Sequence, residues 1–501
     1  MHSTKKDAFF ARMEALGLAV TFDDVRLRTG HAQVMPNQVS VESRFSRSVP
    51  LPVPLVSAAM DTVTEHALAI AMAKQGGLGI LHRGLSAEDQ AAEVARVKYH
   101  LNGMIVRPIC VKPEDTVHSI LARREKKGWT FHSFPVTDGN DKLVGVLTGN
   151  DFDLCDDDSL PAEKVMTQQV IYAPEGTTLE QAHQHMKKHR CKVLPIVDGE
   201  GRVVGLYTLS DVKRILSGLD KTNNVDARGQ LRVGAAVGTG EEALQRVEML
   251  HQENVDVIVI DSAHGDSEPV LVTLRNIKAA FPHLDVVAGN ISEPDSAARL
   301  LEAGADGIKV GQGPGSICTT RKIAGVGCPQ VTAVYNCARV AAEYDVPVCA
   351  DGGIRYSGDI PIALAAGADS VMLGNLLAGT KEAPGPVTFY QGRQWKGYRG
   401  MGSLGALEAN AASRERYRQT GKHFVPEGIE GLVPYKGELA EILPQYIGGL
   451  RNGMGYVGAA SVAELQAKAD FIRITVAGED ESHPHDVVIT KEAPNYQRGD
   501  T

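Results

Sequence analysis

The strongest constraint on the fold is a recurring unit in which a short apolar run ends in Gly, Asp or Asn and a helix-like stretch follows. Examples of the runs are LVSAAMD, GLGILH, VDVIVIDSAHG, LDVVAGN, DGIKVGQGPG, VPVCADGGI and DSVMLGN. Several are apolar throughout rather than alternating, which is typical of parallel strands buried on both faces. The segments 241–254, 293–305, 329–344 and 356–368 carry helical apolar spacing. About eight such units predict an α/β fold of the (β/α)8 type, a TIM barrel.

A doubly wound parallel sheet is the alternative fold. No G-x-G-x-x-G opens a βαβ unit in the Rossmann manner, which disfavours that alternative. In a barrel, the polar residues that close the strands meet at one rim. We therefore expect the chemistry at the strand ends, which are Asp61, Asp261, Asn290, Gly311–Cys318, Asp351 and Gly374.

Two segments in the first half of the chain are copies of one pattern. Residues 135–151 (PVTDGNDKLVGVLTGND) and 195–211 (PIVDGEGRVVGLYTLSD) match in register. Each predicts a strand, an Asp-Gly turn, a second strand and an Asp that opens a helix. Amphipathic helix signals at 116–128 and 178–189 precede the copies. Such a duplication indicates a structural unit that is repeated in tandem.

The duplicated segment resembles a pair of cystathionine-synthase-type (CBS) modules, a Bateman domain, inserted at 104–221. The resemblance implies one module over 104–161 and one over 162–221, and it implies binding of purine nucleotides such as ATP, GTP and GDP. The nucleotide contacts of that family fall on Thr148, Asp151, Thr208 and Asp211. A structural insertion that binds nothing is the alternative. The rest of the chain, 1–103 and 222–501, is then the barrel.

Charge and cysteine content narrow the class of protein. The net charge of −9 disfavours a nucleic-acid partner. No apolar run approaches the roughly 18 residues that a membrane span needs. Arg12 and Glu14 interrupt the apolar stretch near the start, so we expect no signal peptide. The 7 cysteines are odd in number and lack C-x-x-C spacing, which is typical of reduced thiols in a cytoplasmic protein.

The segment VGQGPGSICTTR (310–321) is the most informative stretch for chemistry. Its glycines and proline exclude a regular helix or strand and predict a tight loop that presents backbone groups to a ligand or ion. Cys318 lies on this loop, and Arg321 follows it. A nearby cation lowers the pKa of a thiol from about 8.5 and favours a thiolate nucleophile. By contrast, Cys337 and Cys349 occupy apolar positions of a helix and a strand, and we expect both to be buried.

Glycines also follow the strands in CADGGIR (349–355) and VMLGN (371–375). Backbone N–H groups in such turns bind anions, and barrels often bind phosphate after their last strands. Asp351 is a short carboxylate beside this region and suits a ribose diol. A phosphate site, a ribose site and a reactive cysteine together indicate a nucleotide that is attacked covalently.

Motifs spread over essentially the whole chain resemble the inosine-5′-monophosphate (IMP) dehydrogenase family. They are LVSAAMDTVTE, DSAHG, GPGSICTTR, ADGGIR, YRGMGSLGA, VPEGIEG, GGLRNGMGYVGA and ESHPHDVVITKEAPNY. The cysteine motif is shared with the related GMP reductases. The segment at about 400–431 favours the dehydrogenase, because it contains Arg416 and Tyr417 where that enzyme has its water-activating pair. It is long, polar and bounded by glycine, which predicts a mobile flap.

The resemblance implies an NAD-dependent oxidoreductase of purine and GMP biosynthesis. The Cys318 thiolate would add to C2 of IMP, and hydride would pass from C2 to the nicotinamide of NAD⁺. The flap would then enter the vacated site, and the thioimidate would be hydrolysed to xanthosine 5′-monophosphate (XMP). Arg416 would activate the water, Tyr417 would orient Arg416, and Thr320 would position the water.

The remaining site residues are implied by the resemblance alone. The substrate residues are Ser316, Gly353, Gly374 and Asn375 for the phosphate, Asp351 for the ribose, and Tyr398, Met401, Gly402 and Glu427 around the purine. The dinucleotide residues are Asp261, Ser262, Asn290 and Gly311. A potassium ion would be held by carbonyls of Gly313, Gly315 and Cys318 and by Glu481, Ser482 and His483 of a neighbouring subunit. The shared K⁺ implies a homotetramer, and the pairing of tetramers into octamers stays open.

Three residues depart from the family pattern: Asn375 replaces a usual Ser, Gln312 an apolar residue, and Arg418 a Phe.

Two other functions stay open. One is a CBS-containing GMP reductase that takes hydride from NADPH and uses Thr320 and Glu427 for acid–base chemistry. The other is a non-catalytic relative whose output is nucleotide binding at the CBS pair.

Overall fold

The computed structural model describes residues 4–100, 104–106, 108–127, 129, 131–216, 222–417, 423–491, 493 and 495–496. The chain divides into two compact units. The larger consists of Met1–Lys98, Thr222–Asn224 and Leu231–Thr501, and the smaller of Tyr99–Lys221 and Val225–Gln230.

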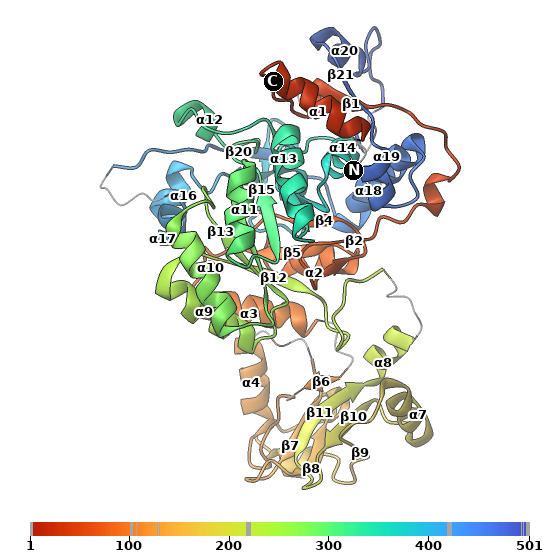
Figure 1. Ribbon diagram of the computed structural model, residues 1–501. Coiled ribbons are helices and arrows are strands. Elements are labelled where there is room, and N and C mark those ends of the chain that lie inside the picture. Colours follow the sequence, from red (N-terminus) through yellow and green to blue (C-terminus); the bar gives the residue numbers. More distant parts are fainter. Residues whose placement is uncertain are drawn as a thin grey trace. The chain divides into compact units, whose positions relative to one another are not determined.

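The larger unit is built around a closed barrel of parallel strands (Figure 1). Around the barrel the order is β12-β13-β14-β15-β16-β17-β4-β5. The strands are β4 (Leu55–Ser57), β5 (Leu78–Leu81), β12 (Val233–Val237), β13 (Val257–Asp261), β14 (Asp285–Ile291), β15 (Gly307–Val310), β16 (Val348–Asp351) and β17 (Ser370–Leu373). The (β/α)8 prediction is confirmed, and closure excludes a doubly wound sheet.

The barrel strands are buried on both faces, as their continuous apolar runs predict. Every residue of β12 and β13 is buried. Alternate side chains, among them Ile80, Val257, Val259 and Met372, pack together in one core cluster. Because the pleat directs successive side chains to opposite faces, the other set packs against the surrounding helices.

Helices follow most barrel strands, as the helical spacing predicts. They are α2 (His66–Lys74), α3 (Ala87–Lys98), α9 (Gly240–Gln252), α10 (Glu268–Ala280), α11 (Pro294–Glu302), α13 (Gln330–Glu343) and α14 (Asp359–Ala366). After β17 the chain forms α15 (Asn375–Ala378) and the antiparallel sheet β18 (Val387–Tyr390), β19 (Arg393–Arg399) and β20 (Glu430–Pro434). It ends with α18 (Leu439–Val457), α19 (Val462–Lys468), β21 (Phe471–Arg473) and α20 (Val476–Glu481).

The N-terminal segment packs on the C-terminal one. Helix α1 is Lys5–Ala15, and β1 (Val25–Leu27) pairs antiparallel with β21. A short hairpin of β2 (Ser43–Arg44) and β3 (Pro50–Leu51) precedes the first barrel strand. Two single turns of 3₁₀ helix lie at Phe22–Asp24 and Pro36–Gln38.

The smaller unit contains the two copies of the repeat as two antiparallel hairpins. One is β7 (Phe134–Thr137) with β8 (Leu143–Leu147), and the other is β10 (Val193–Val197) with β11 (Val203–Thr208). The predicted helices 116–128 and 178–189 are confirmed as α4 (Val117–Lys127) and α7 (Leu179–His189). The other elements are β6 (Ile105–Val106), α5 (Gly149–Asp153), α6 (Ala162–Val165), β9 (Ala173–Pro174) and α8 (Leu209–Leu216).

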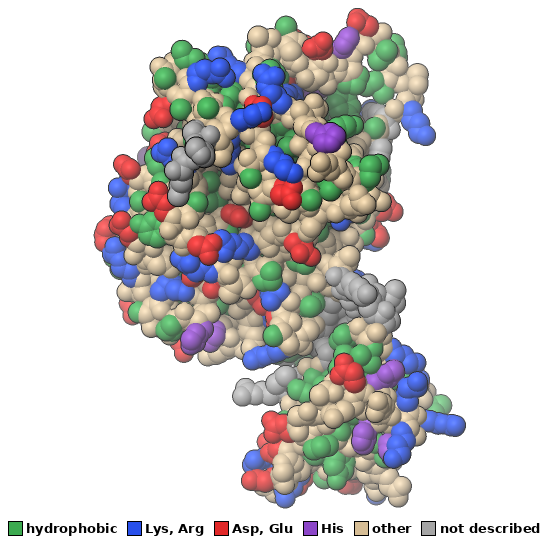
Figure 2. Space-filling view, turned by 45° about the vertical axis from the view of Figure 1, so that its right-hand side comes forward, with side chains coloured by type: hydrophobic (Ala, Val, Ile, Leu, Met, Phe, Trp, Pro, Cys, Tyr) green, Lys and Arg blue, Asp and Glu red, His purple; other side chains and the backbone are tan. Residues whose placement is uncertain are grey.

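One face of the larger unit is mixed in charge. On the face seen in Figure 2, acidic and basic side chains are interspersed. Among the helices in the described part of the chain, none combines the length and the apolarity that a membrane crossing requires.

Candidate active site

The cysteine loop follows β15 and is shaped by its glycines. Gly311 has a φ of 151° and Gly313 a φ of 77°. A Cβ on Gly311 would lie 2.0 Å from the carbonyl oxygen of Asp351, so no side chain fits where the loop passes the end of β16. The loop ends at α12 (Thr320–Ile323). The predicted tight loop is therefore present.

Cys318 is partly exposed on this loop. Its Sγ lies 3.2 Å from Oγ1 of Thr320. The loop is held from the other side by the end of the flap, where the Thr319 N–H donates to the Glu427 carbonyl at 2.9 Å. Cys318, Thr320 and Glu427, three residues that the sequence assigned to the chemistry, line the same cavity.

Four of the other cysteines have thiols with raised pKa values. Cys337 and Cys349 are buried, as expected. Burial raises the pKa of Cys349 to about 12 and that of Cys337 further above its usual range. Burial likewise raises the pKa values of Cys110 and Cys328 to about 11. These four thiols are poor nucleophiles at neutral pH.

Arg321 braces the loop through backbone carbonyls. Its Nε donates to Gln312 O at 3.0 Å and its Nη2 to Cys328 O at 2.5 Å. The side chain of Gln312, which departs from the family pattern, accepts a hydrogen bond from Ser292 Oγ at 2.7 Å. These three contacts hold the loop that carries Cys318.

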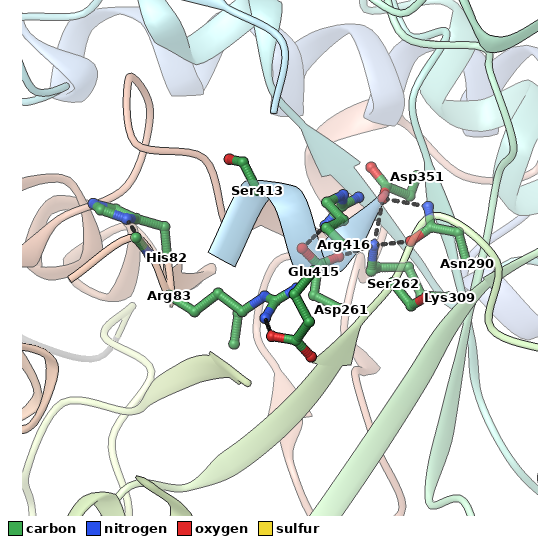
Figure 3. A network of polar contacts seen from close by, with 12 residues as sticks. His82, Arg83, Asp261, Ser262, Asn290, Lys309, Asp351, Ser413, Glu415 and Arg416 are labelled. Atoms are coloured by element: carbon green, nitrogen blue, oxygen red, sulfur yellow. Dashed lines mark hydrogen bonds and ion pairs between the residues drawn. The ribbon is translucent and has the colours of Figure 1, made fainter. Parts of the chain in front are cut away.

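A buried lysine lies at the centre of the polar network at the barrel rim (Figure 3). Lys309 is 2% exposed, and its Nζ donates to Asp351 Oδ2 at 2.7 Å, to Asp261 Oδ1 at 3.1 Å and to Asn290 Oδ1. The Asn290 amide in turn donates to Asp351 Oδ2 at 2.9 Å and to the Gly311 carbonyl at 2.8 Å. One cation therefore links residues predicted for the dinucleotide to the residue predicted for the substrate ribose.

Arg416 reaches the same network from the flap. Its Nη1 forms an ion pair with Asp261 Oδ2. Burial lowers the pKa of Arg416, while Tyr417, to which it is hydrogen-bonded, acts in the opposite direction. Among the described residues, the Nε of Arg416 has no hydrogen-bond partner. A Cβ on Gly402 would lie 2.6 Å from the Tyr417 ring, so the glycine makes room for this tyrosine.

The flap contains helices where the sequence predicted a polar loop. Helix α16 is Leu404–Ala409 and α17 is Ala411–Arg416. The Ser403 and Asn410 side chains accept hydrogen bonds from backbone N–H groups three residues on, which caps both helices. Alanine-rich composition favours the helical state. Arg418 lies outside the described residues.

With the exception of Gly402, the residues predicted for the phosphate and purine line one cavity of about 1980 Å³ together with Cys318. Asn375 Nδ2 donates to Ser316 Oγ at 3.2 Å. Tyr398 is buried, which raises its pKa, and it is hydrogen-bonded to Ser316. A Cβ on Gly374 would lie 2.7 Å from the Tyr398 hydroxyl, so a glycine is needed there. The same cavity is lined by Gly353, Met401 and Glu427.

Ser262 follows Asp261 at the end of β13. Its N–H donates to the Gly289 carbonyl at 3.1 Å, and its Oγ donates to the His264 carbonyl at 3.1 Å. The hydroxyl therefore holds the turn that carries Asp261 at the rim.

The residues predicted for K⁺ fall in two places. Gly313, Gly315 and Cys318 share the cysteine loop, where the Gly315 carbonyl accepts the Cys318 N–H at 3.1 Å. Glu481 and Ser482 lie at the end of α20. The Nδ1 of His483 lies 2.8 Å from the hydroxyl of Tyr496 in the same chain.

In the smaller unit, the four predicted nucleotide residues form two equivalent helix caps. Thr148 Oγ1 donates to Asp151 Oδ2 at 2.8 Å before α5, and Thr208 Oγ1 donates to Asp211 Oδ2 before α8. The repeat in the sequence therefore corresponds to a repeat in local structure. Nucleotide binding at these caps stays a prediction.

The sequence reasoning missed Lys309 and a group around Glu415. A lysine inside the apolar run DGIKVGQ was the available signal for Lys309, because a charge on a strand buried on both faces needs partners. Glu415 bonds to Arg83 and Thr239, which lie far from it in the sequence and give no local pattern.

Comparison with known proteins places these features in one family. The model of the IMP dehydrogenase / GMP reductase domain matches residues 19–485. The chain is 54% identical over 483 residues to an inosine-5′-monophosphate dehydrogenase of Aquifex aeolicus, covering 95% of this chain and 97% of the relative. It is 46% identical over 482 residues to the Bacillus subtilis protein of that name, covering 95% and 97%.

A solved structure is similar over nearly the whole chain as well. It is a cysteine-to-alanine variant of GMP reductase from Trypanosoma brucei in complex with guanosine 5′-monophosphate. The TM-score is 0.85 at 40% identity, and the match covers 95% of this chain and 100% of that one.

Proposed function

The chain belongs to the IMP dehydrogenase / GMP reductase family, and from this premise we propose that it oxidises IMP to XMP with NAD⁺. Curated relatives that align with this chain over nearly their full length, at 46% and 54% identity, are inosine-5′-monophosphate dehydrogenases. The observation that carries the proposal is the ion pair between Arg416 and Asp261, both of which line the same cavity as Cys318.

Cys318 would act as the nucleophile. Its thiolate adds to C2 of IMP, C2 then gives up a hydride, and a thioimidate joins sulfur to the purine. NAD⁺ supplies the hydride acceptor when bound. Asp351 would hold the ribose hydroxyls, and Ser316, Asn375 and the nearby glycines would hold the phosphate.

Arg416 and Tyr417 would serve the second half of the reaction. Water adds to C2 of the thioimidate, the C–S bond breaks, and XMP leaves with regeneration of the Cys318 thiol. The lowered pKa of Arg416 supports a role as the base that takes the proton from water. Thr320, 3.2 Å from the sulfur, lies where it can orient that water.

The two halves of the reaction would use one site in turn. Asp261, assigned with Ser262, Asn290 and Gly311 to the dinucleotide, is paired with Arg416 in this structure. A ribose diol on Asp261 requires that Arg416 move away. The residues present fit the dinucleotide, because Asp261 at the rim offers a carboxylate to that diol. Hydride transfer and hydrolysis are therefore separated by movement of the flap.

We further propose K⁺ on the carbonyls of the cysteine loop, with Glu481, Ser482 and His483 of a neighbour completing the site in a homotetramer. Hard carbonyl oxygens suit such a cation. The smaller unit would bind purine nucleotides at its two Thr–Asp caps. The cytoplasm, where IMP and NAD⁺ are available, is the proposed location.

GMP reduction is the second candidate, and the similarity to a GMP reductase structure over the whole chain favours keeping it. In that reaction Thr320 and Glu427 would handle the proton and NADPH would supply hydride. Both residues lie at the cysteine loop here.

Absorbance at the nicotinamide band separates the two activities. The purified protein is incubated with K⁺, IMP and NAD⁺, and in parallel with GMP and NADPH. Formation of NADH with XMP as product supports the dehydrogenase. Consumption of NADPH with GMP alone would replace it by the reductase.

A further inference from the structure

Helix α17 is attached to the barrel rim by Glu415, the residue before Arg416. Glu415 Oε2 forms an ion pair with Arg83 Nη1 at 2.5 Å. Its Oε1 accepts the Thr239 N–H at 2.7 Å and the Thr239 hydroxyl at 3.0 Å. In Figure 3, Glu415 reaches Arg83 and Arg416 reaches Asp261 from the same short helix. Adjacent residues of α17 thus make two separate anchors.

The receptor for Glu415 is built into the barrel. The Arg83 side chain is 7% exposed and follows β5, while Thr239 is the N-cap of the 13-residue helix α9. The positive end of that helix favours a carboxylate. A Cβ on Gly238 would lie 2.3 Å from Arg83 Nη1 and 2.5 Å from both Glu415 oxygens, so a side chain at this position would displace the ends of the paired side chains.

Besides the Glu415 contacts and the Arg416–Asp261 ion pair, a backbone contact joins α17 to the barrel. The helix is only 6 residues long. Its last residue is held by the backbone contact Ala263 N–H to Arg416 O at 3.4 Å, which is long for a hydrogen bond. The Glu415 anchor is also charged at neutral pH, since Arg83 and Thr239 hold its pKa below the usual range against the opposing effect of burial. Glu415 is therefore a main contributor to the docked position.

We propose that Glu415 is a positioning residue that fastens α17 to Arg83 and Thr239, so that Arg416 occupies Asp261 in preference to the dinucleotide. The inference rests on the proposed function, in which dinucleotide and flap use one site in turn. Arg83, Thr239 and Gly238 form the receptor, and none of them lines the Cys318 cavity.

Weakening this anchor has two opposite effects. The open state becomes more populated, so NAD⁺ competes better for Asp261 and also rebinds to the thioimidate. The docked state becomes less populated, so Arg416 meets the thioimidate less often and hydrolysis slows. Hydride transfer, which takes place with the flap away, keeps its rate.

The test is stopped-flow NADH absorbance on the full-length Glu415→Gln protein with IMP, NAD⁺ and K⁺. We expect a burst rate within about twofold of the unaltered protein and a steady-state rate about tenfold lower. Inhibition by excess NAD⁺ should begin at about tenfold lower concentration, a shift of about 1.4 kcal/mol. Arg83→Gln should act similarly, and the double variant should add little, because both remove one interaction.

The matched control is Glu408→Gln, a charge removal on the exposed surface of α16 in the same flap. It should leave burst, steady state and NAD⁺ inhibition unchanged. If Glu415→Gln lowers burst and steady state together, or if it changes neither, the proposal is overturned.

Hydrogen exchange of the ligand-free protein tests the anchor without relying on the reaction. Amides of 411–417 should exchange about tenfold faster in Glu415→Gln than in Glu408→Gln, because the anchor no longer holds the helix. Equal exchange in the two variants would overturn the anchor even if IMP is turned over. Failure of the unaltered protein to form NADH would instead refute the proposed function, and exchange would still decide the anchor.

Discussion

Replacement of Lys309 by methionine tests whether one buried cation organises both ligand sites. Methionine is close in length to lysine and apolar, so the change removes the charge with little change in volume. Three hydrogen bonds are lost, to Asp351, Asp261 and Asn290. Two carboxylates then face each other at the rim without the cation between them, although Arg416 still pairs with Asp261 when the flap is docked.

The cost follows from burial. Breaking a buried charged pair by removing one partner costs about 3–5 kcal/mol, a large part of the roughly 5–15 kcal/mol that stabilises a typical domain. Repulsion should also displace Asp351 and Asp261 from the positions in which they meet their ligands. We expect the KM values for IMP and NAD⁺ to rise by at least about tenfold each, equivalent to about 1.4 kcal/mol.

The assay combines urea unfolding with steady-state kinetics. The chain has 2 tryptophans, Trp129 in the smaller unit and Trp395 in the larger, so a Trp129→Phe background lets fluorescence report the larger unit alone. The control is Lys98→Met. Lys98 is also a buried, paired lysine, since it is 1% exposed and its Nζ lies 2.8 Å from Asp256 Oδ2. It lies at the end of α3, away from the cysteine loop. The control should lose similar stability and keep both KM values.

Two results would refute the reasoning about Lys309. One is a stability loss below about 1 kcal/mol, which would mean that the buried charge is not engaged as the contacts indicate. The other is equal KM changes in the Lys309 and Lys98 variants. Adding Asp261→Asn to Lys309→Met should restore part of the lost stability, because it removes one of the two facing charges.

Three further outcomes follow. Cys318→Ala should abolish turnover while calorimetry shows IMP binding largely kept, and residual turnover near the normal rate would exclude covalent catalysis. Because burial lowers the pKa of Arg416, its neutral form becomes more populated as pH rises. Hydrolysis should therefore accelerate with rising pH more than the NADH burst does, and parallel profiles would contradict its role as base. Deleting 104–221 should keep NADH formation, since the barrel strands lie outside that segment, and it should remove any response to ATP, GDP or GTP.

The barrel was predictable because its signal is local and repeated. A run such as VDVIVID is apolar throughout, and burial on both faces of a parallel strand explains that composition. The cysteine loop was predictable for a related reason: GQGPG fits neither helix nor strand. The motif carrying Cys318 therefore indicated both its structure and its exposure.

Contacts between distant segments were not predictable from the residues. Arg83 and Glu415 are 332 positions apart, and nothing near either residue indicates its partner. Lys309 gains its partners only in the folded barrel, where β13, β14 and β16 bring three polar side chains to its amine. The helices of the flap were missed because its glycines and charges outweighed the alanines of 406–412.

The most direct measurement is mass spectrometry of the protein quenched in acid during turnover of IMP and NAD⁺. The Arg416→Ala variant is used because slow hydrolysis lets the covalent species accumulate. We predict a purine nucleotide attached to the peptide that contains Cys318, formed in step with NADH. An unmodified Cys318 peptide while NADH is produced, or a nucleotide attached to any other cysteine, would contradict it.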